Sequence, residues 1–287
     1  VICVKGTMRK APTKEGVEIA VKELKVLNRP VEPLPLLPRD STKAVLDTRL
    51  KFRWLDVRNP RVTKIFLLQA WIAQKFREYF RSQKFVEIFT PKIVGAGTEG
   101  GAEVFPVIYF GKPAFLAQSP QFYKQFAVIA GLERVFEVGP VFRAEPHHTV
   151  RHLTEYHSMD IEVGFIDSYF DVIKFVEGFV KFLAENLEKD DFARKVLEEF
   201  NVEPIKIPSE VPKITMRQAY EILKGEFNKE IPYGEDLDSE GEKLLGQYVK
   251  EKYKSDMVFV IEYPWKVRPF YTMRKEDEPD WTYSFDG

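Results

Sequence analysis

The chain has 287 residues, and its 43 Lys and Arg residues almost balance its 44 Asp and Glu residues. With 44% hydrophobic and 14% aromatic residues, it can bury one large core and one smaller one, so we expect a soluble globular protein rather than a disordered one. The apolar runs are too short to cross a bilayer, no secretory signal opens the sequence, and the single cysteine, Cys3, excludes an internal disulfide, so we expect a cytoplasmic protein without a membrane association.

The front of the chain is basic. Residues 1–64 contain fifteen Lys or Arg and seven Asp or Glu, so the remainder of the chain is acidic. Residues 1–12 and 17–27 alternate apolar and polar side chains, which predicts two strands of a small antiparallel barrel. Such a basic module either faces phosphates or is simply a solvated surface.

A proline-rich connector at 29–38 follows and cannot be helix or central strand, so it predicts a semi-rigid linker. Asn59 and Pro60 are typical of an N-cap and first helical residue, and they predict a long amphipathic helix that ends near Gln83. We therefore expect three parts: residues 1–28, a linker or hinge at 29–58, and a main body at 59–287.

The main body is predicted to mix helices and strands. Residues 85–94, closed by Pro91, are predicted as one strand, and further strands are predicted within 114–120, 135–145 and 158–166. Helices are predicted at 171–187 and after two capping boxes, Thr215-x-x-Gln218 and Ser239-x-x-Glu242. The pattern favours an α+β fold.

All four histidines lie within eleven positions: His147, His148, His152 and His157. A structural zinc site needs three or four converging ligands, and an adjacent pair followed by gaps of four and five residues fits that geometry poorly. Basic side chains in a loop between two strands are typical of polyphosphate binding. The pattern therefore favours an anion-binding loop, and a metal site remains the weaker alternative.

Four motifs occur in order: RWLDVRNP at 53–60, GTEGGAEVFPV at 97–107, LAQSPQFYKQ at 116–125 and FRAEPHHTVRHLTEYHSMDIE at 142–162. Together they resemble the class II aminoacyl-tRNA synthetases of the aspartate, asparagine and lysine subgroup, most closely the archaeal-type aspartyl-tRNA synthetases. The resemblance implies an antiparallel catalytic sheet flanked by helices, with the end of an OB-fold β-barrel before it. Residues 1–28 would then be a partial anticodon-binding domain and residues 59–287 an incomplete catalytic domain.

The resemblance implies the ATP-dependent activation of aspartate to aspartyl-adenylate and transfer of the aspartyl group to the 3′ end of a tRNA, with Mg²⁺ as cofactor. By resemblance, Arg143 would bridge the amino acid's carboxylate and the α-phosphate, where a planar fork of donors is better than a point charge. Glu145 would accept a hydrogen bond from the adenine amino group, and Tyr156 would stack on adenine. The expected triphosphate-loop residues are His147, His148, Arg151 and His152.

The resemblance also implies an aspartate pocket. Lys124 matches the residue that contacts the side-chain carboxylate, and the residues that match those around the ammonium group are Glu99, Gln121 and Asp160. Ser119 matches the pocket's edge, Tyr271 matches a further pocket residue, and Asp286 matches a magnesium-contacting carboxylate. Taken singly, each of these residues has an ordinary surface role as its alternative reading.

The family's third motif is expected after residues 284–286, where the given sequence ends. We therefore expect these residues to belong to a longer synthetase and not to form adenylate by themselves. An asparaginyl-tRNA synthetase or a synthetase-like asparagine synthetase is the alternative within the family. A catalytically silent, synthetase-like RNA-binding protein is the alternative of another class. Expected partners are tRNA(Asp), with tRNA(Asn) left open, aspartate, ATP and a second copy of the chain in a homodimer.

Overall fold

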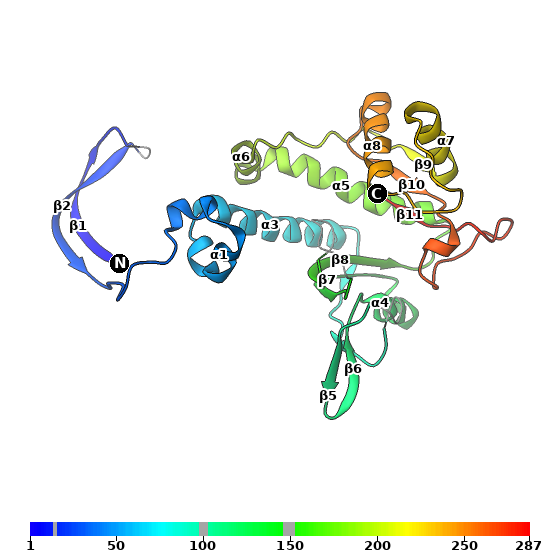
Figure 1. Cartoon of the computed structure of the whole chain (residues 1–287), viewed down its shortest axis with the longest axis horizontal. Coiled ribbons are helices and arrows are strands. Elements are labelled where there is room, and N and C mark those ends of the chain that lie inside the picture. The colour runs from blue at the N-terminus through cyan, green and yellow to red at the C-terminus, as the bar shows by residue number, and fades with distance from the viewer. Residues whose placement is uncertain (14–15, 98–102, 146–152) are drawn as a thin grey trace. The chain divides into compact units, whose positions relative to one another are not determined.

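A computed structural model describes residues 1–13, 16–97, 103–145 and 153–287 (Figure 1). The chain divides into two compact units, Val1–Leu67 and Leu68–Gly287. The domain boundaries expected near residues 28 and 58 stay predictions.

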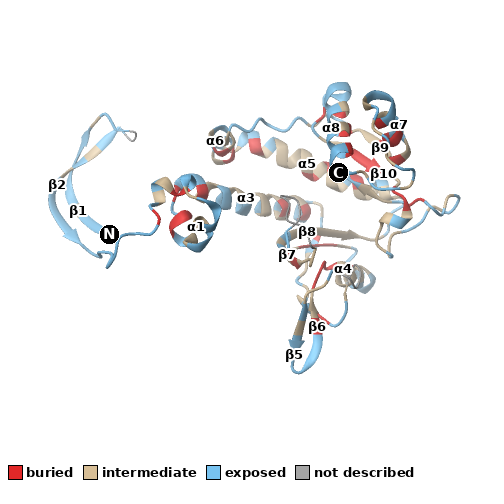
Figure 2. Cartoon of the chain, viewed as in Figure 1, coloured by how far each residue is buried: buried red, intermediate tan, exposed pale blue. Residues whose placement is uncertain are grey.

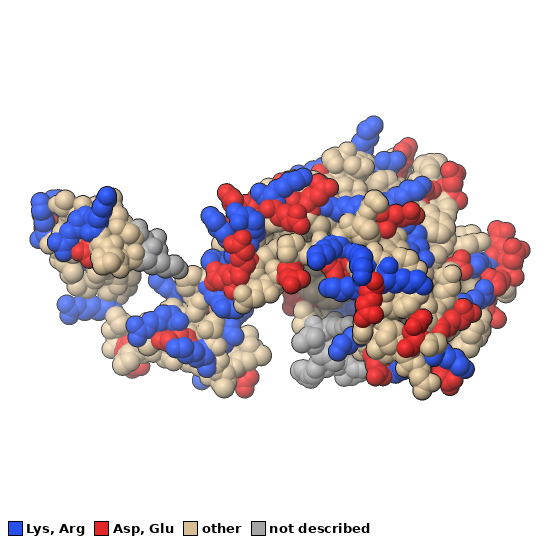
Figure 3. Space-filling model, turned by 90° about the horizontal axis from the view of Figure 1, so that it is seen from above, with Lys and Arg blue, Asp and Glu red and all other residues tan. Residues whose placement is uncertain are grey.

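The first unit begins with the predicted antiparallel hairpin. Strands β1 (Ile2–Lys10) and β2 (Val17–Val26) pair from Ile2 opposite Val26 to Lys10 opposite Val17. The register shifts between Lys5 and Gly6, where a Cβ on Gly6 would lie 2.2 Å from the carbonyl oxygen of Ala20. Almost every residue of the two strands is exposed, and Figure 2 shows both mostly in pale blue. Figure 3 shows basic side chains outnumbering acidic ones on the visible face of this hairpin.

The stretch expected to be a linker contains three short helices: η1 (Pro38–Lys43), α1 (Leu46–Lys51) and α2 (Arg53–Asp56). Asp56 is fully buried and forms ion pairs with Arg49, at 3.0 Å, and with Arg53. Burial acts to raise the pKa of Asp56, but the hydrogen bonds from Arg49 and Ser41 hold it below its ordinary value. This ion-paired turn precedes helix α3.

Helix α3 (Pro60–Ser82) begins and ends where the sequence predicts. The side-chain oxygen of Asn59 accepts a hydrogen bond from the backbone N–H of Arg61 at 3.0 Å, which confirms the N-cap. In the second unit, Phe76 and Phe80 of α3 are buried against Phe136 and Phe179, with ring centroids 5.1 to 6.3 Å apart. This aromatic cluster is the core on which the site is built.

The central sheet of the second unit has the order β3 (Val86–Glu87), β7 (Arg134–Phe142) and β8 (Glu155–Val163). Strands β7 and β8 are antiparallel over nine residue pairs, and β3 is parallel to β7. Phe136 lies in β7 and Phe179 in α5 (Tyr169–Lys189), so α3 and α5 both pack against this sheet. The predicted α+β fold with an antiparallel sheet and flanking helices is confirmed.

Residues 85–94 do not form the single strand predicted for them. They form β3 and, separately, β4 (Ile93–Val94). Between the two, the buried carboxylate of Glu137 accepts hydrogen bonds from Thr90 N and Oγ1, both at 2.7 Å, and from Lys92 Nζ at 2.9 Å. This carboxylate takes the place of a strand partner for Thr90, and Pro91 has no N–H to offer, so the strand is interrupted.

The described part of the second unit also contains two smaller sheets. The first has the order β4, β6 (Lys112–Leu116) and β5 (Pro106–Tyr109), all antiparallel, and helix α4 (Gln121–Ala127) with a π-helical turn η2 (Val128–Leu132) follows it. The second has the order β11 (Phe285–Asp286), β10 (Phe259–Ile261) and β9 (Lys213–Thr215), with β9 and β10 parallel.

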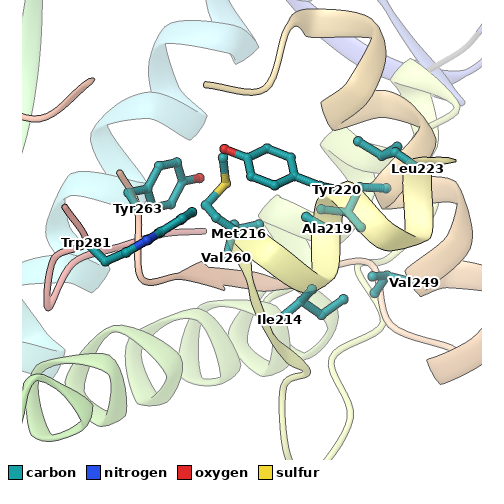
Figure 4. Close-up of a cluster of buried hydrophobic side chains, with 10 residues drawn as sticks. Ile214, Met216, Ala219, Tyr220, Leu223, Val249, Val260, Tyr263 and Trp281 are labelled. Carbon is teal, nitrogen blue, oxygen red and sulfur yellow. The ribbon is translucent and has the colours of Figure 1, made fainter. Parts of the chain in front are cut away.

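Among the described residues, the other helices are α6 (Asp191–Phe200), α7 (Met216–Phe227), α8 (Ser239–Tyr253) and the 3₁₀ turn η3 (Trp265–Val267). The Thr215 capping box of α7 is confirmed. The Ser239 box is wrong, because Asp238 is the N-cap of α8 and its carboxylate accepts from Gly241 N at 2.7 Å. Buried side chains of α7, α8, β10 and Trp281 form a separate core (Figure 4).

Among the described residues, no helix is both long enough and apolar enough to cross a membrane.

Candidate active site

A buried lysine lies at the centre of the candidate site. Lys124 of α4 is only 4% exposed, and its Nζ donates to Asp160 Oδ1 at 3.0 Å and to the carbonyl oxygen of Ile161 at 3.1 Å. Its Nζ also lies 3.7 Å from Glu162 Oε2. Asp160 and Glu162 are two residues apart on β8, so both side chains point to the face that α4 covers. One ammonium and two carboxylates leave this group of charges net negative.

The start of α4 supplies two more polar groups to the same place. Gln121 Nε2 donates to Glu162 Oε2 at 3.2 Å, and Ser119 Oγ accepts from Gln121 N at 3.3 Å. Ser158 Oγ donates to the second oxygen of Asp160. Through these contacts and Glu162, the structure brings Ser119, Gln121, Lys124 and Asp160 together.

Glu162 belongs to this cluster although it was not among the residues chosen from the sequence. Burial raises the pKa of the Glu162 carboxyl above its ordinary value, while Lys124 and Gln121 act in the opposite direction. The signal that could have found it is the alternation of a strand, since a residue two positions after Asp160 must share its face.

Backbone hydrogen bonds place the segment before α4 beside the end of β7. Ala117 N donates to the carbonyl oxygen of Lys92 at 3.0 Å, and Phe142 N donates to that of Ala117 at 2.9 Å. The carbonyl oxygen of Glu103 accepts both from Ala144 N, at 3.0 Å, and from Gln118 Nε2, at 3.2 Å. These hydrogen bonds therefore hold the segment that precedes α4 beside the end of β7, where Arg143 follows.

Arg143 follows β7 directly, and its backbone N–H donates to the carbonyl oxygen of Thr154 at 3.0 Å. The centre of its guanidinium group lies 5.9 Å from the ring centroid of Tyr156 on β8, which is the geometry of a cation–π contact. Glu145 is half-buried two residues further on. A guanidinium, an aromatic ring and a carboxylate thus lie at one end of the β7–β8 hairpin.

Several predicted residues lie outside the described part of the chain: Glu99, His147, His148, Arg151 and His152. His157 is exposed on β8, where it pairs with Pro140 and points away from the face of Asp160. Among the described residues, no group of three or more His, Cys, Asp or Glu side chains could hold a metal ion.

The loop that carries Tyr271 reaches α4. The ring of Phe270 lies 6.3 Å from that of Phe122 and 5.5 Å from that of Tyr271. Asp286 lies on β11 and forms an ion pair with Arg268 at 3.0 Å. The guanidinium of Arg268 in turn lies 3.7 Å from the ring centroid of the buried Tyr263, and burial raises the pKa of that phenol.

Comparisons with known proteins agree with the motifs. Residues 45–287 match the family model described as tRNA synthetases class II (D, K and N). Over all its 287 residues the chain is 67% identical to the aspartate–tRNA(Asp/Asn) ligase of Aeropyrum pernix and 44% identical to the aspartate–tRNA(Asp) ligase of Pyrococcus abyssi. The chain spans 64% and 65% of the lengths of these two relatives.

Two solved structures are similar over 99% of this chain. One is the asparaginyl-tRNA synthetase from Pyrococcus horikoshii complexed with asparaginyl-adenylate, with a TM-score of 0.86, 28% identity and 64% of that chain covered. The other is the aspartyl-tRNA synthetase from Entamoeba histolytica, with a TM-score of 0.83, 31% identity and 61% of that chain covered.

Proposed function

This chain belongs to the class II tRNA synthetases of the D, K and N group, and from that premise we propose that it supplies most of the amino-acid-activating site of an aspartate–tRNA ligase. In the proposed reaction, the α-carboxylate of aspartate attacks the α-phosphate of ATP, which gives aspartyl-adenylate and pyrophosphate. The 3′-terminal ribose hydroxyl of the tRNA then takes the aspartyl group. Positioning and charge neutralisation are the main tasks of the protein in both steps.

The observation that carries the proposal is the environment of Lys124. Its ammonium group has three N–H donors, and Asp160 and the Ile161 carbonyl accept two of them. The third can meet the side-chain carboxylate of aspartate, while the carboxylates of Asp160 and Glu162 favour the substrate's ammonium group. The buried cation of Lys124 is the group that favours a side-chain carboxylate over the neutral amide of asparagine.

Arg143 is proposed to bind the α-phosphate and the substrate's α-carboxylate together, because a guanidinium presents two parallel donors to such oxygens. Tyr156 and Glu145 would bind adenine. Further ATP contacts are proposed for His147, His148, Arg151 and His152, and Glu99 is proposed to bind the substrate's ammonium group. All five residues are outside the described ranges.

Mg²⁺ is part of the proposal and would neutralise charge on the ATP phosphates. Mg²⁺ is commonly held by one or two carboxylates together with substrate phosphates. Asp286 is exposed at the end of β11, so it can serve as one such carboxylate. To bind Mg²⁺, Asp286 would have to leave its ion pair with Arg268 or bind Arg268 and the metal with different carboxylate oxygens.

The test replaces the matched stretch of the Aeropyrum pernix relative with these 287 residues and measures aspartate-dependent exchange of pyrophosphate into ATP. We expect activity in this chimaera and not in the 287 residues alone. Arg143→Ala should lower the rate by about 10²- to 10³-fold, which is typical for loss of one charge-stabilising donor. Arg194→Ala, which removes two exposed ion pairs of α6, is the matched control and should leave the rate unchanged.

The likeness to an asparaginyl-tRNA synthetase makes asparagine specificity the second candidate. Exchange should be faster with aspartate than with asparagine, and Lys124→Met should remove the preference. A preference for asparagine in the unsubstituted chimaera would overturn the choice. If the unsubstituted chimaera showed no aspartate-dependent exchange but bound RNA, and Arg143→Ala left that binding unchanged, the chain would instead fit a synthetase-like protein that only binds RNA.

We further propose tRNA(Asp) as partner, and tRNA(Asn) as well, since the relative at 67% identity is an aspartate–tRNA(Asp/Asn) ligase. Charging of purified tRNA(Asn) by the chimaera tests this.

A homodimer is proposed from the resemblance, and Phe89 and Ile93, which flank Pro91 and are 82% and 48% exposed, offer apolar surface for it. Light scattering measures the mass. A cytoplasmic location is likewise proposed, and the free Cys3 is compatible with it.

A further inference from the structure

The loop between Tyr263 and Thr282 contains Tyr271 and reaches α4 through the neighbouring Phe270, but two apolar side chains near its tip are largely exposed. Phe270 is 64% exposed and Met273 is 62% exposed, although the ring of Phe270 contacts Phe122. Because exposed apolar side chains contribute little to holding a loop in place, the position of the tip depends on contacts made elsewhere along the loop.

One group of those contacts is centred on Arg217 of α7. Its two terminal nitrogens donate to the two carboxylate oxygens of Glu278 at 3.1 and 2.6 Å, and its Nε donates to the hydroxyl of Tyr233 at 3.1 Å. The centre of the same guanidinium lies 4.3 Å from the ring centroid of Trp281. A bidentate pair combined with a ring contact fixes both the position and the plane of Arg217.

Lys275 ties a second part of the loop to the same carboxylate. Its Nζ lies 3.1 Å from Glu278 Oε2 and 2.9 Å from Glu262 Oε2, next to β10. Its backbone N–H donates to the carbonyl oxygen of Trp281 at 2.8 Å. Two segments of the loop therefore meet at one group of charges.

This group of charges rests on a rigid support. Trp281 and Tyr263 are 5% and 4% exposed and belong to the buried cluster that contains Met216, the residue before Arg217. Figure 4 shows Trp281, Tyr263 and Met216 side by side. The two ends of the loop and the start of α7 are thus parts of one packed core.

We propose that Arg217, Lys275 and Glu278, here termed the loop-base cluster, are positioning residues that hold Tyr271 at the α4 side of the aspartate pocket. This inference rests on the proposed function and deepens it. Arg143 is carried by a different element, the β7–β8 hairpin, so loosening the loop-base cluster should weaken aspartate binding and leave the chemical step nearly intact.

The kinetic test uses the chimaera with Glu278→Gln and with Arg217→Lys, since a lysine cannot form the bidentate pair. Each change should raise the KM for aspartate by about tenfold, the loss expected for a charge-assisted hydrogen bond. The kcat and the KM for ATP should stay within about twofold of the unsubstituted values. Glu230→Gln is the control. It breaks the ion pair between Glu230 and Lys224 of α7, at 2.8 Å, and leaves the contacts of the loop unchanged.

An aspartate KM that stays equal to that of Glu230→Gln would overturn the inference. Equal losses in kcat and in both KM values would also overturn it, since they would show general damage to the fold.

A second measurement does not depend on activity. In the 287-residue chain, amide hydrogen exchange at residues 269–276 should be faster in Glu278→Gln and Arg217→Lys than in Glu230→Gln. Equal exchange in all three variants would show that the loop-base cluster does not hold the loop. An inactive unsubstituted chimaera would instead refute the proposed function, and the exchange data would still decide the structural half of the inference.

Discussion

The two long hairpins of this chain have strands of nearly equal length but different surroundings. Strands β1 and β2 have 9 and 10 residues and are exposed on both faces. Strands β7 and β8 have 9 residues each, and in β7 the side chains of Val135, Phe136 and Val141 are at most 1% exposed. Helices α3 and α5 cover this second hairpin. Four residues of the candidate site lie on its strands or directly after them: Arg143, Tyr156, Asp160 and Glu162. A period of two predicts a strand, but only the covered hairpin can hold side chains rigidly enough for catalysis.

The largest expected difference between the two hairpins is in stability. Phe136→Ala should lower the free energy of unfolding by about 3–5 kcal/mol, because the ring is fully buried against Phe76 and Phe80. Ile19→Ala on β2 removes a side chain that is 54% exposed, and it should change the same quantity by about 0.5 kcal/mol or less. Urea unfolding measures both, and similar losses would show that the first hairpin is also covered by packing in solution.

A smaller effect on stability is expected where helices α3 and α5 pack against each other over the β7–β8 hairpin. A Cβ on Gly178 of α5 would lie 2.0 Å from the hydroxyl oxygen and 3.1 Å from Cζ of Tyr79 on α3. Gly178→Ala should therefore push the two helices or the tyrosine aside and cost about 1–3 kcal/mol. Gly246→Ala is the matched control, since a Cβ there meets nothing within 4 Å, and it should gain about 0.5–1 kcal/mol from helix propensity. A stabilised Gly178→Ala variant would show that α3 and α5 are packed less closely.

The smallest expected effect concerns charge and compares Glu162 of β8 with Glu278 at the surface. Burial raises the pKa of Glu162, so the folded state binds this proton more tightly than the unfolded state does, and stability falls as pH rises above the ordinary value of 4.5. The pKa of Glu278 is shifted in the opposite direction. Hydrogen bonds from Arg217 and Lys275 lower its pKa to about 2, so its stabilisation is present above 4.5 and is lost as pH falls toward about 2.

Unfolding free energies between pH 2 and 8 test this contrast. As pH rises through 4.5, Glu162→Gln should gain stability relative to the unsubstituted chain, and Glu278→Gln should lose it. Equal trends for the two variants would contradict the assignment of opposite causes.

Much of the fold could be predicted because its signals are local. The alternation in β7 and β8, the cap at Asn59 and the box at Thr215 each depend on residues within one element. The prediction for 85–94 was wrong because the group that interrupts the strand, Glu137, is 47 residues away from Thr90. The Ser239 prediction was wrong because the preceding Asp238 takes the N-cap position, so Ser239 is already the first residue of α8.

The candidate site could be assembled from the sequence only through the order of the motifs. Lys124 and Asp160 are separated by 36 residues, and no periodicity predicts that they form an ion pair. The loop-base cluster was not predicted at all, because Arg217 and Glu278 lie 61 residues apart and in no recognisable motif.

The carbonyl oxygen of Glu103, which accepts from both Ala144 N and Gln118 Nε2, has a consequence for genetic screens. Every amino acid supplies that oxygen, so side-chain substitutions at position 103 will leave this junction intact and will understate its importance. Replacing the amide of residue 144 by an ester, through chemical ligation, is the change that would expose it.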